Sequence, residues 1–166
     1  MNLNDPRNII NYTNSEAYDE PFQSYIRGHI YIEALLSEII ERSFENPEGI
    51  KKVTNSFYNK VKIVRDYDRV SIPMKNLLLQ INSVRNKLAH KLEFTLIFED
   101  VFELVKTAAE AKVDFSDDNI HMDRNYSELN YGVTGVVAEL MSNTFSQIIF
   151  ENEDMFTKED IGRFLC

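Results

Sequence analysis

Apolar residues recur at intervals of three and four positions along most of this chain, and this spacing limits the possible folds more than any other feature. The clearest stripe consists of Phe22, Ile26, Ile30, Ile32, Leu35, Leu36, Ile39, Ile40 and Phe44. Such spacing gathers side chains on one face of an α-helix, and the width of this stripe predicts a helix that is contacted from two sides. Only five glycines and four prolines interrupt the 166 residues, which favours long helices over a turn-rich β architecture.

The same spacing predicts further helices over residues 53–68, 73–88, 98–111, 133–150 and 158–164. The acidic interval from Asp114 to Asn130 is predicted to be a long loop or a short hairpin. We therefore expect a single all-α domain over residues 1–166, an up-and-down antiparallel bundle of about five long helices with a short C-terminal helix. Its expected parts are a polar arm (1–20), a four-helix core (22–112), an acidic loop (113–131) and the C-terminal helices (132–166).

The helix predicted over residues 133–150 carries apolar residues around much of its circumference. This indicates either a central helix or one half of a subunit contact. Gly132 and Gly135, near its start, are expected to permit a close approach of backbones.

Composition points to a soluble protein. Apolar residues make up 43% of the chain, which is sufficient for a packed core. The single cysteine, Cys166, cannot form an internal disulfide, and the first twenty residues contain no signal-like apolar run. No apolar segment reaches the roughly 20 residues that a membrane helix requires. A cytoplasmic location without a membrane partner is expected.

The net charge of −9 is unevenly distributed. Residues 51–91 hold ten Lys and Arg against two acids, whereas residues 1–50 and 92–166 are acidic. An acidic chain is a poor candidate for coating nucleic acid without specificity, because such binding depends on many phosphate contacts. A basic segment fits one local anion site. Alternatively, these bases are solvated helix faces that pair with acids of the flanking segments.

The basic segment ends in Arg85-Asn86-Lys87-Leu88-Ala89-His90. An arginine that clamps a phosphate and a histidine that carries protons near neutral pH suffice for RNA cleavage without a metal. On one helix Arg85 and His90 point about 140° apart. Both reach one phosphate only at a frayed helix end or when a second copy supplies the partner. Alternatively, Arg85 pairs with an acid of a neighbouring helix and His90 caps the helix C-terminus.

This motif resembles the signature of the HEPN superfamily, in which an arginine is followed by four to six residues and a histidine. The resemblance rests on the segment INSVRNKLAHKL. With RGHIYIEALLSEII and FYNKVKIV, the pattern over residues 22–105 is similar to the mannitol operon repressor-like branch. The resemblance implies a homodimer whose two motifs line one composite cleft. Catalytic members are metal-independent endoribonucleases, frequently toxins or anti-phage effectors, and Arg85, His90 and supporting Asn86 carry over as the catalytic residues.

Two functions remain open at this point. One is an endoribonuclease that needs no cofactor and whose Lys87 and Lys91 contact RNA. The other is a non-catalytic transcriptional regulator or protein-interaction module of the repressor-like branch. HEPN toxins that a nucleotidyltransferase antitoxin silences carry a tyrosine two residues after the histidine, and this chain has Leu92 there. The sequence therefore does not support that form of toxin–antitoxin pairing, although another protein partner fits either function.

His29 and Glu33 lie one helical turn apart within the apolar stripe of residues 22–44. A carboxylate on such a face requires a partner. We expect Glu33 either to hold Arg85 in place across a helix pair or to hydrogen-bond locally with His29.

The sequence predicts no metal site. Asp114, Ser116 and Asp118 begin like a calcium loop, but Asn119 and Asn125 occupy the positions that require glycine and glutamate. One cysteine and three scattered histidines lack the spacing of a zinc site.

Overall fold

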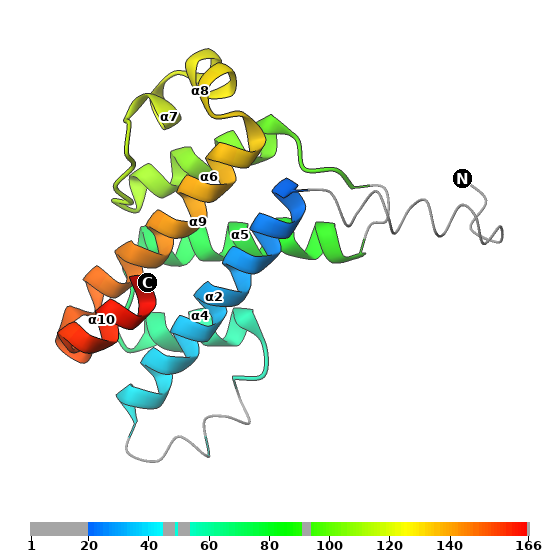
Figure 1. Ribbon diagram of the computed structural model, residues 1–166. Helices are drawn as coiled ribbons and strands as arrows, with labels where there is room; N and C mark the ends of the chain where they lie inside the picture. The colour runs from blue at the N-terminus through cyan, green and yellow to red at the C-terminus, as the bar shows by residue number, and fades with distance from the viewer. Residues whose placement is uncertain (1–19, 45–48, 50–53, 91–93, 166) are drawn as a thin grey trace.

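The computed structural model describes residues 20–44, 49, 54–90 and 94–165 of the chain. Within these ranges the chain forms helices and no strands, so the all-α prediction is confirmed (Figure 1). The helices are α2 (Glu20–Ser43), α4 (Phe57–Asp66), α5 (Ile72–His90), α6 (Phe98–Glu110), α7 (Asn119–Met122), α8 (Arg124–Asn130), α9 (Gly132–Glu151), the 3-10 turn η1 (Glu153–Met155) and α10 (Lys158–Leu165). Apart from Glu20, the predicted N-terminal arm lies outside the described residues.

The acidic interval differs from the prediction, because it forms the short helices α7 and α8 instead of a loop or hairpin. Aspartates lie at the start of each helix and accept hydrogen bonds from its first backbone N–H groups. The Asp123 carboxylate accepts a hydrogen bond from the backbone N–H of Tyr126 at 3.0 Å, and Asp117 accepts one from the N–H of Asn119 at 2.9 Å. Aspartate at such positions satisfies backbone donors that a helix start leaves without partners. The residues that indicate a loop in the sequence therefore begin helices.

Helix α2 is buried over a wide face, as its broad apolar stripe predicts. It packs against α9 on one side and against α4 and α5 on the other. The buried set is Tyr25, His29, Ile32, Leu35, Leu36, Ile39 and Ile40. The prediction that Ile30 belongs to the stripe is wrong, since its side chain is 56% exposed. Ile30 is turned about 100° from buried His29, which moves it beyond the edge of the stripe.

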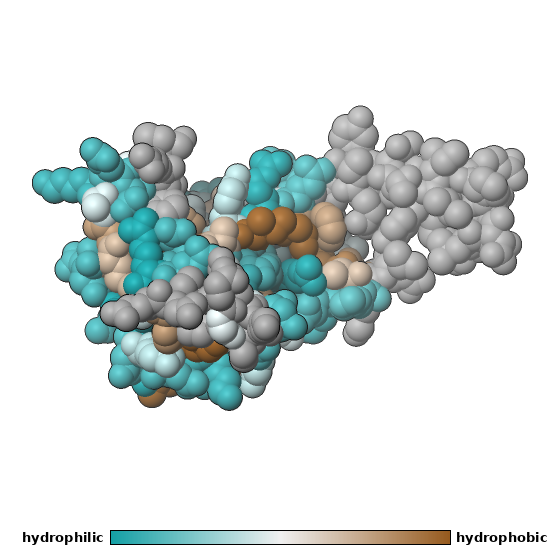
Figure 2. All heavy atoms as spheres, turned by 90° about the horizontal axis from the view of Figure 1, so that it is seen from below, coloured by the Kyte–Doolittle hydropathy of each residue, from teal (hydrophilic) through white to brown (hydrophobic). Residues whose placement is uncertain are grey.

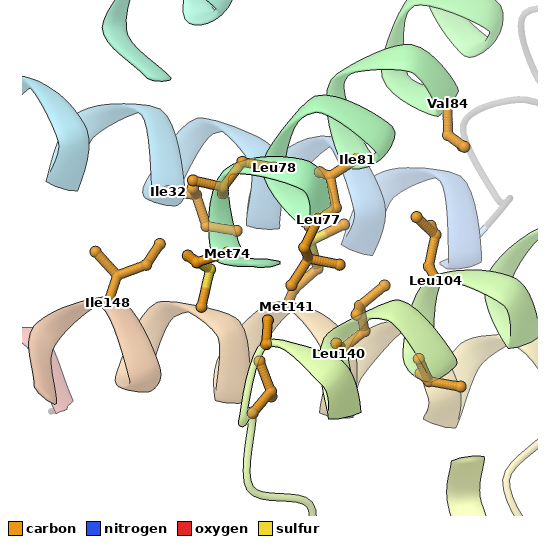
Figure 3. Close-up of a cluster of buried hydrophobic side chains, with 14 of the residues drawn as sticks. Ile32, Met74, Leu77, Leu78, Ile81, Val84, Leu104, Leu140, Met141 and Ile148 are labelled. Atoms are coloured by element: carbon orange, nitrogen blue, oxygen red, sulfur yellow. The ribbon is translucent and has the colours of Figure 1, made fainter. Parts of the chain in front are cut away.

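The core lies where α5 and α6 meet α2 and α9 (Figure 3). The side chains that meet there are Ile32 of α2, Met74, Leu77, Leu78 and Ile81 of α5, Leu104 of α6, and Leu140, Met141 and Ile148 of α9. Each large apolar side chain that leaves water contributes about 1.5–3 kcal/mol to folding. Helix α9 contacts α2, α6 and α8, so it is a central helix of the bundle.

The surface of the described residues is mainly hydrophilic when seen from below, although a patch of hydrophobic residues lies within it (Figure 2). None of the described helices combines the length and the apolar character that crossing a bilayer requires. The large apolar side chains with the greatest exposure are Leu129 at 86% and Met122 at 72%, both in the α7–α8 region.

At Gly28 the backbone of α2 packs directly against Met141 of α9. A Cβ atom at this position would lie 2.5 Å from Met141 Cγ and 2.6 Å from Met141 Cβ. The expectation of a close approach at Gly132 was wrong, because nothing lies within 4 Å of its missing Cβ. Gly132 instead has a φ of +58°, a conformation that glycine adopts without steric cost. At Gly135 the nearest atom is Tyr131 Cβ in the preceding helical turn, at 3.1 Å.

We predict that Gly28→Ala lowers the free energy of unfolding by about 1–3 kcal/mol, because the added methyl overpacks the contact with Met141. Urea unfolding followed by circular dichroism measures the change. The matched control is Gly162→Ala on α10, where nothing lies within 4 Å of the added Cβ. There the better helix propensity of alanine is expected to stabilise by up to about 1 kcal/mol. Equal effects of the two substitutions would contradict the packing argument.

Candidate functional site

The packing of α5 orients the Arg85–His90 segment at its C-terminal end. The buried stripe of this helix is Met74, Leu77, Leu78, Ile81, Val84 and Leu88. Its position is also held by the Tyr25 hydroxyl, which donates a hydrogen bond to the Ile81 carbonyl oxygen at 3.0 Å. Because Val84 and Leu88 point inward, Asn86, Lys87 and His90 are exposed to solvent.

Arg85 is half-buried beside these exposed residues. Its Nη1 donates a hydrogen bond to Asn86 Oδ1 at 3.3 Å. An ion pair between Arg85 and an acid of a neighbouring helix was the alternative to a functional role, and no carboxylate among the described residues is paired with it. Its charge therefore remains available to an anionic ligand.

His90 is the last residue of α5, and its imidazole is exposed. Along the helix that α5 forms through His90, Arg85 points away from His90 and donates its hydrogen bond to Asn86. This agrees with the divergence of about 140° between the two positions of a helix. Lys87 is exposed, with Nζ 5.9 Å from the centroid of the Phe94 ring. Lys91 lies outside the described residues.

Both expectations for Glu33 were wrong. Its Oε1 accepts a hydrogen bond from Lys60 Nζ at 2.8 Å, and it is bonded neither to Arg85 nor to His29. The cause is the position of α4, which packs against α2 and carries Lys60 to the carboxylate. Glu33 thus joins α2 to α4 and does not position the motif directly.

Beneath Arg85 lies a polar contact that the sequence analysis missed. Nε2 of His29 lies 3.2 Å from Oδ1 of Asn82, and because a carbonyl oxygen only accepts, Nε2 is the donor. The imidazole is only 3% exposed and stacks on Phe57 with ring centroids 4.2 Å apart. The sequence feature that could have indicated this contact is Asn82, a polar residue three positions before Arg85. At this spacing the two residues lie on the same face of α5.

Burial lowers the pKa of His29, and the hydrogen bond with Asn82 and the charge of Glu33 only partly offset this effect. The positive charges of Arg85 and Lys60 lower it further. His29 therefore stays neutral under conditions in which an ordinary histidine is partly charged. A neutral imidazole behind Arg85 adds no competing positive charge to the motif.

The bases of residues 51–91 divide into two groups according to whether a described acid pairs with them, and the interpretation that they pair with acids holds for the first group. Within the described residues, three of its bases form ion pairs with acids. These pairs are Lys60–Glu33 at 2.8 Å, Arg65–Asp68 at 2.7 Å and Arg69–Asp154 at 2.8 Å. Four other bases have no ion pair with a described carboxylate, namely Lys62, Lys75, Arg85 and Lys87. Within the described part of this segment, the bases that lack such a pair thus lie on α4 and α5.

The end of α5 therefore presents a guanidinium, an amide, an ammonium and an imidazole to solvent. These groups can bind an anion through charge-assisted hydrogen bonds and can transfer protons. In the part of the chain with assigned positions, no three His, Cys, Asp or Glu side chains are grouped so that they could hold a metal ion.

Comparison of the chain with models of protein families, with curated proteins and with solved structures gave no match. The function must therefore be argued from the residues of this chain.

We predict that His29 makes stability depend on pH. Because its pKa is lower in the folded than in the unfolded protein, protons favour the unfolded state. The free energy of unfolding should therefore fall as the pH drops below the ordinary histidine pKa of about 6.5. His29→Gln keeps a donor for Asn82 but cannot ionise. Urea unfolding between pH 7.5 and 5 should show a shallower fall for this variant, and equal slopes would refute the prediction.

Proposed function

We propose that this chain is a HEPN-like, metal-independent endoribonuclease that acts as a homodimer, in the manner of RNA-cleaving toxins and anti-phage effectors. The observation that carries the proposal is the solvent-facing end of α5, where Arg85 has no described acidic partner and Asn86 and His90 are exposed. An arginine without a structural ion pair retains its full charge for a substrate phosphate.

The chemistry requires little beyond these side chains. In RNA cleavage the 2′-hydroxyl attacks the adjacent phosphorus, while a base removes its proton and an acid protonates the departing 5′ oxygen. An imidazole performs both proton transfers near neutral pH, which gives His90 the role of general acid and base. Arg85 binds the phosphate oxygens as negative charge develops on them. Asn86 orients the phosphate, and Lys87 and Lys91 hold the flanking backbone.

Because α5 is a regular helix through His90, Arg85 and His90 diverge within one chain, and a second copy supplies the partner. A two-fold axis beside the end of α5 brings His90 of one subunit near Arg85 of the other, which completes a site for one phosphate. Two cationic helix ends repel each other in the absence of an anion, and RNA bound between them removes this repulsion. The negative charge of the bound RNA thus stabilises the association of the two helix ends.

The first test is cleavage of single-stranded RNA in the presence of EDTA. We expect Arg85→Ala and His90→Ala each to reduce the rate by at least about 100-fold. The matched control is Arg27→Ala, which removes an exposed arginine about 200° around α2 from His29 and should cleave like the wild type. Cleavage that is absent from the wild type, or equal in all proteins, would remove the proposal.

The second test asks whether the site is composite. Arg85→Ala and His90→Ala proteins are mixed and allowed to exchange subunits, and cleavage is compared with that of each variant alone. A mixed dimer retains one intact arginine and one intact histidine in the shared cleft, so activity should rise well above either variant. Activity that stays at the level of the separate variants contradicts a shared site.

A second candidate is a non-catalytic transcriptional regulator or protein-interaction module. It is favoured by the apolar side chains of Met122 and Leu129, which are 72% and 86% exposed on neighbouring short helices. Exposed apolar patches on a protein surface are typical of protein contacts. A wild-type protein that leaves RNA intact but binds a protein partner through this surface, and loses it with Leu129→Glu, supports this candidate over the nuclease.

A further inference from the structure

A hollow of about 190 Å³ opens between α4 and α5, separate from the end of α5. Its apolar wall is formed by Val61 of α4 and Leu79 of α5. Tyr58 also lines it, and 57% of the tyrosine side chain is exposed. An exposed aromatic ring beside an apolar wall offers a surface on which a flat ring can stack.

The hollow also holds two of the four bases in the described part of residues 51–91 that have no ion pair with a described carboxylate. Lys62 of α4 and Lys75 of α5 line it from opposite helices, and no described carboxylate is paired with either. Arg65 is fixed in the wall, because its Nη1 donates to Asp68 Oδ1 at 2.7 Å and to the Val70 carbonyl oxygen at 3.2 Å. The carboxylate that lines the hollow is that of Asp66, which is exposed to water, where its effect on the lysines is weakened by solvent.

The size of the hollow limits its ligand. Pockets that enclose a whole small molecule usually measure about 300–1,000 Å³. At about 190 Å³ this one is too small to enclose such a ligand. It suits a part of a longer molecule that combines negative charge with a flat ring, which is the chemistry of one nucleotide within a strand.

The position of the hollow relative to the motif supports the same ligand. Lys75 and Asn86 are eleven residues apart on α5, so they lie within about 20° of each other around the helix. The distance between them along the helix axis is about 16 Å. A strand that follows this face of α5 connects the hollow with the exposed Asn86 and His90 over a few nucleotides.

We propose that the hollow is a binding site for single-stranded RNA. One phosphate lies between Lys62 and Lys75, and the adjoining base stacks on Tyr58. The assignment of this strand as the substrate of the motif rests on the proposed function. Binding itself does not, because phosphate contacts and stacking require no catalytic step.

The test measures binding of a fluorescent RNA of about twelve nucleotides, a length suited to one such site, by anisotropy over a range of salt concentrations. All proteins carry His90→Ala so that the RNA stays intact. The double variant Lys62→Gln/Lys75→Gln should weaken binding at least about tenfold at low salt and reduce the salt slope by about 0.7, the contribution of the one phosphate that lies between the two lysines. Tyr58→Ala should weaken binding about tenfold without changing the slope.

The matched control is Lys106→Gln/Lys158→Gln, which changes the net charge equally on two exposed lysines that do not line the hollow. It should bind like the parent protein. Equal affinity and slope in the two double variants overturn the proposal, and so does a parent protein that binds no RNA. Adenosine monophosphate that displaces the RNA as well as an unlabelled strand does would indicate a free-nucleotide site and also overturn it.

The same proteins with His90 restored separate this proposal from the nuclease. Cleavage that is unchanged in Lys62→Gln/Lys75→Gln, together with unchanged binding, removes the hollow and leaves the nuclease. Binding that depends on the two lysines, together with a wild-type protein that does not cleave, removes the nuclease and leaves the hollow.

Discussion

The packing of α5 against α2 decides which parts of the Arg85–His90 segment are available for chemistry. Val84 and Leu88 are drawn into the core, and the Tyr25 hydroxyl fixes the helix through the Ile81 carbonyl. A rotation of α5 by one residue, about 100°, would bury part of the polar segment instead. Apolar burial is worth several kcal/mol over this stripe, whereas an exposed imidazole or amide contributes little to stability. The core therefore orients the polar residues and not the reverse.

Acids pair with only some of the bases in residues 51–91, and this determines where positive charge remains on the surface. Glu33, Asp68 and Asp154 pair with Lys60, Arg65 and Arg69, which join helices and turns. The described acids leave the hollow lysines and the end of α5 unpaired. An acidic protein can thus present a local positive region, because charge at a surface acts over about 8–10 Å at physiological salt. The net charge of −9 describes the whole chain and not the face that an approaching anion meets.

The apolar periodicity was sufficient to predict α2, α4, α5 and α6 together with α9 and α10, because burial of one face determines each of them. It could not predict α7 and α8, because the aspartates at their starts are equally common in loops. The exposure of Asn86 and His90 follows from the burial of Val84 and Leu88 on the same helix. The partner of Glu33 could not be predicted, since several cations lie within reach of α2 and only the packing of α4 selects Lys60. The hollow between α4 and α5 could not be predicted from the sequence either, because its existence depends on the distance between the two helices.

The proposed dimer places a symmetric protein on an asymmetric ligand. A two-fold axis beside the end of α5 relates two hollows, whereas an RNA strand has a direction. Phosphates repeat evenly along the strand, so Lys62 and Lys75 of either subunit can bind one. The base next to that phosphate has opposite orientations at the two hollows, so stacking on Tyr58 cannot be equivalent in both subunits. One hollow then holds a phosphate and a base while the other holds a phosphate, and this difference selects which of the two His90–Arg85 pairs acts on the strand at the shared cleft.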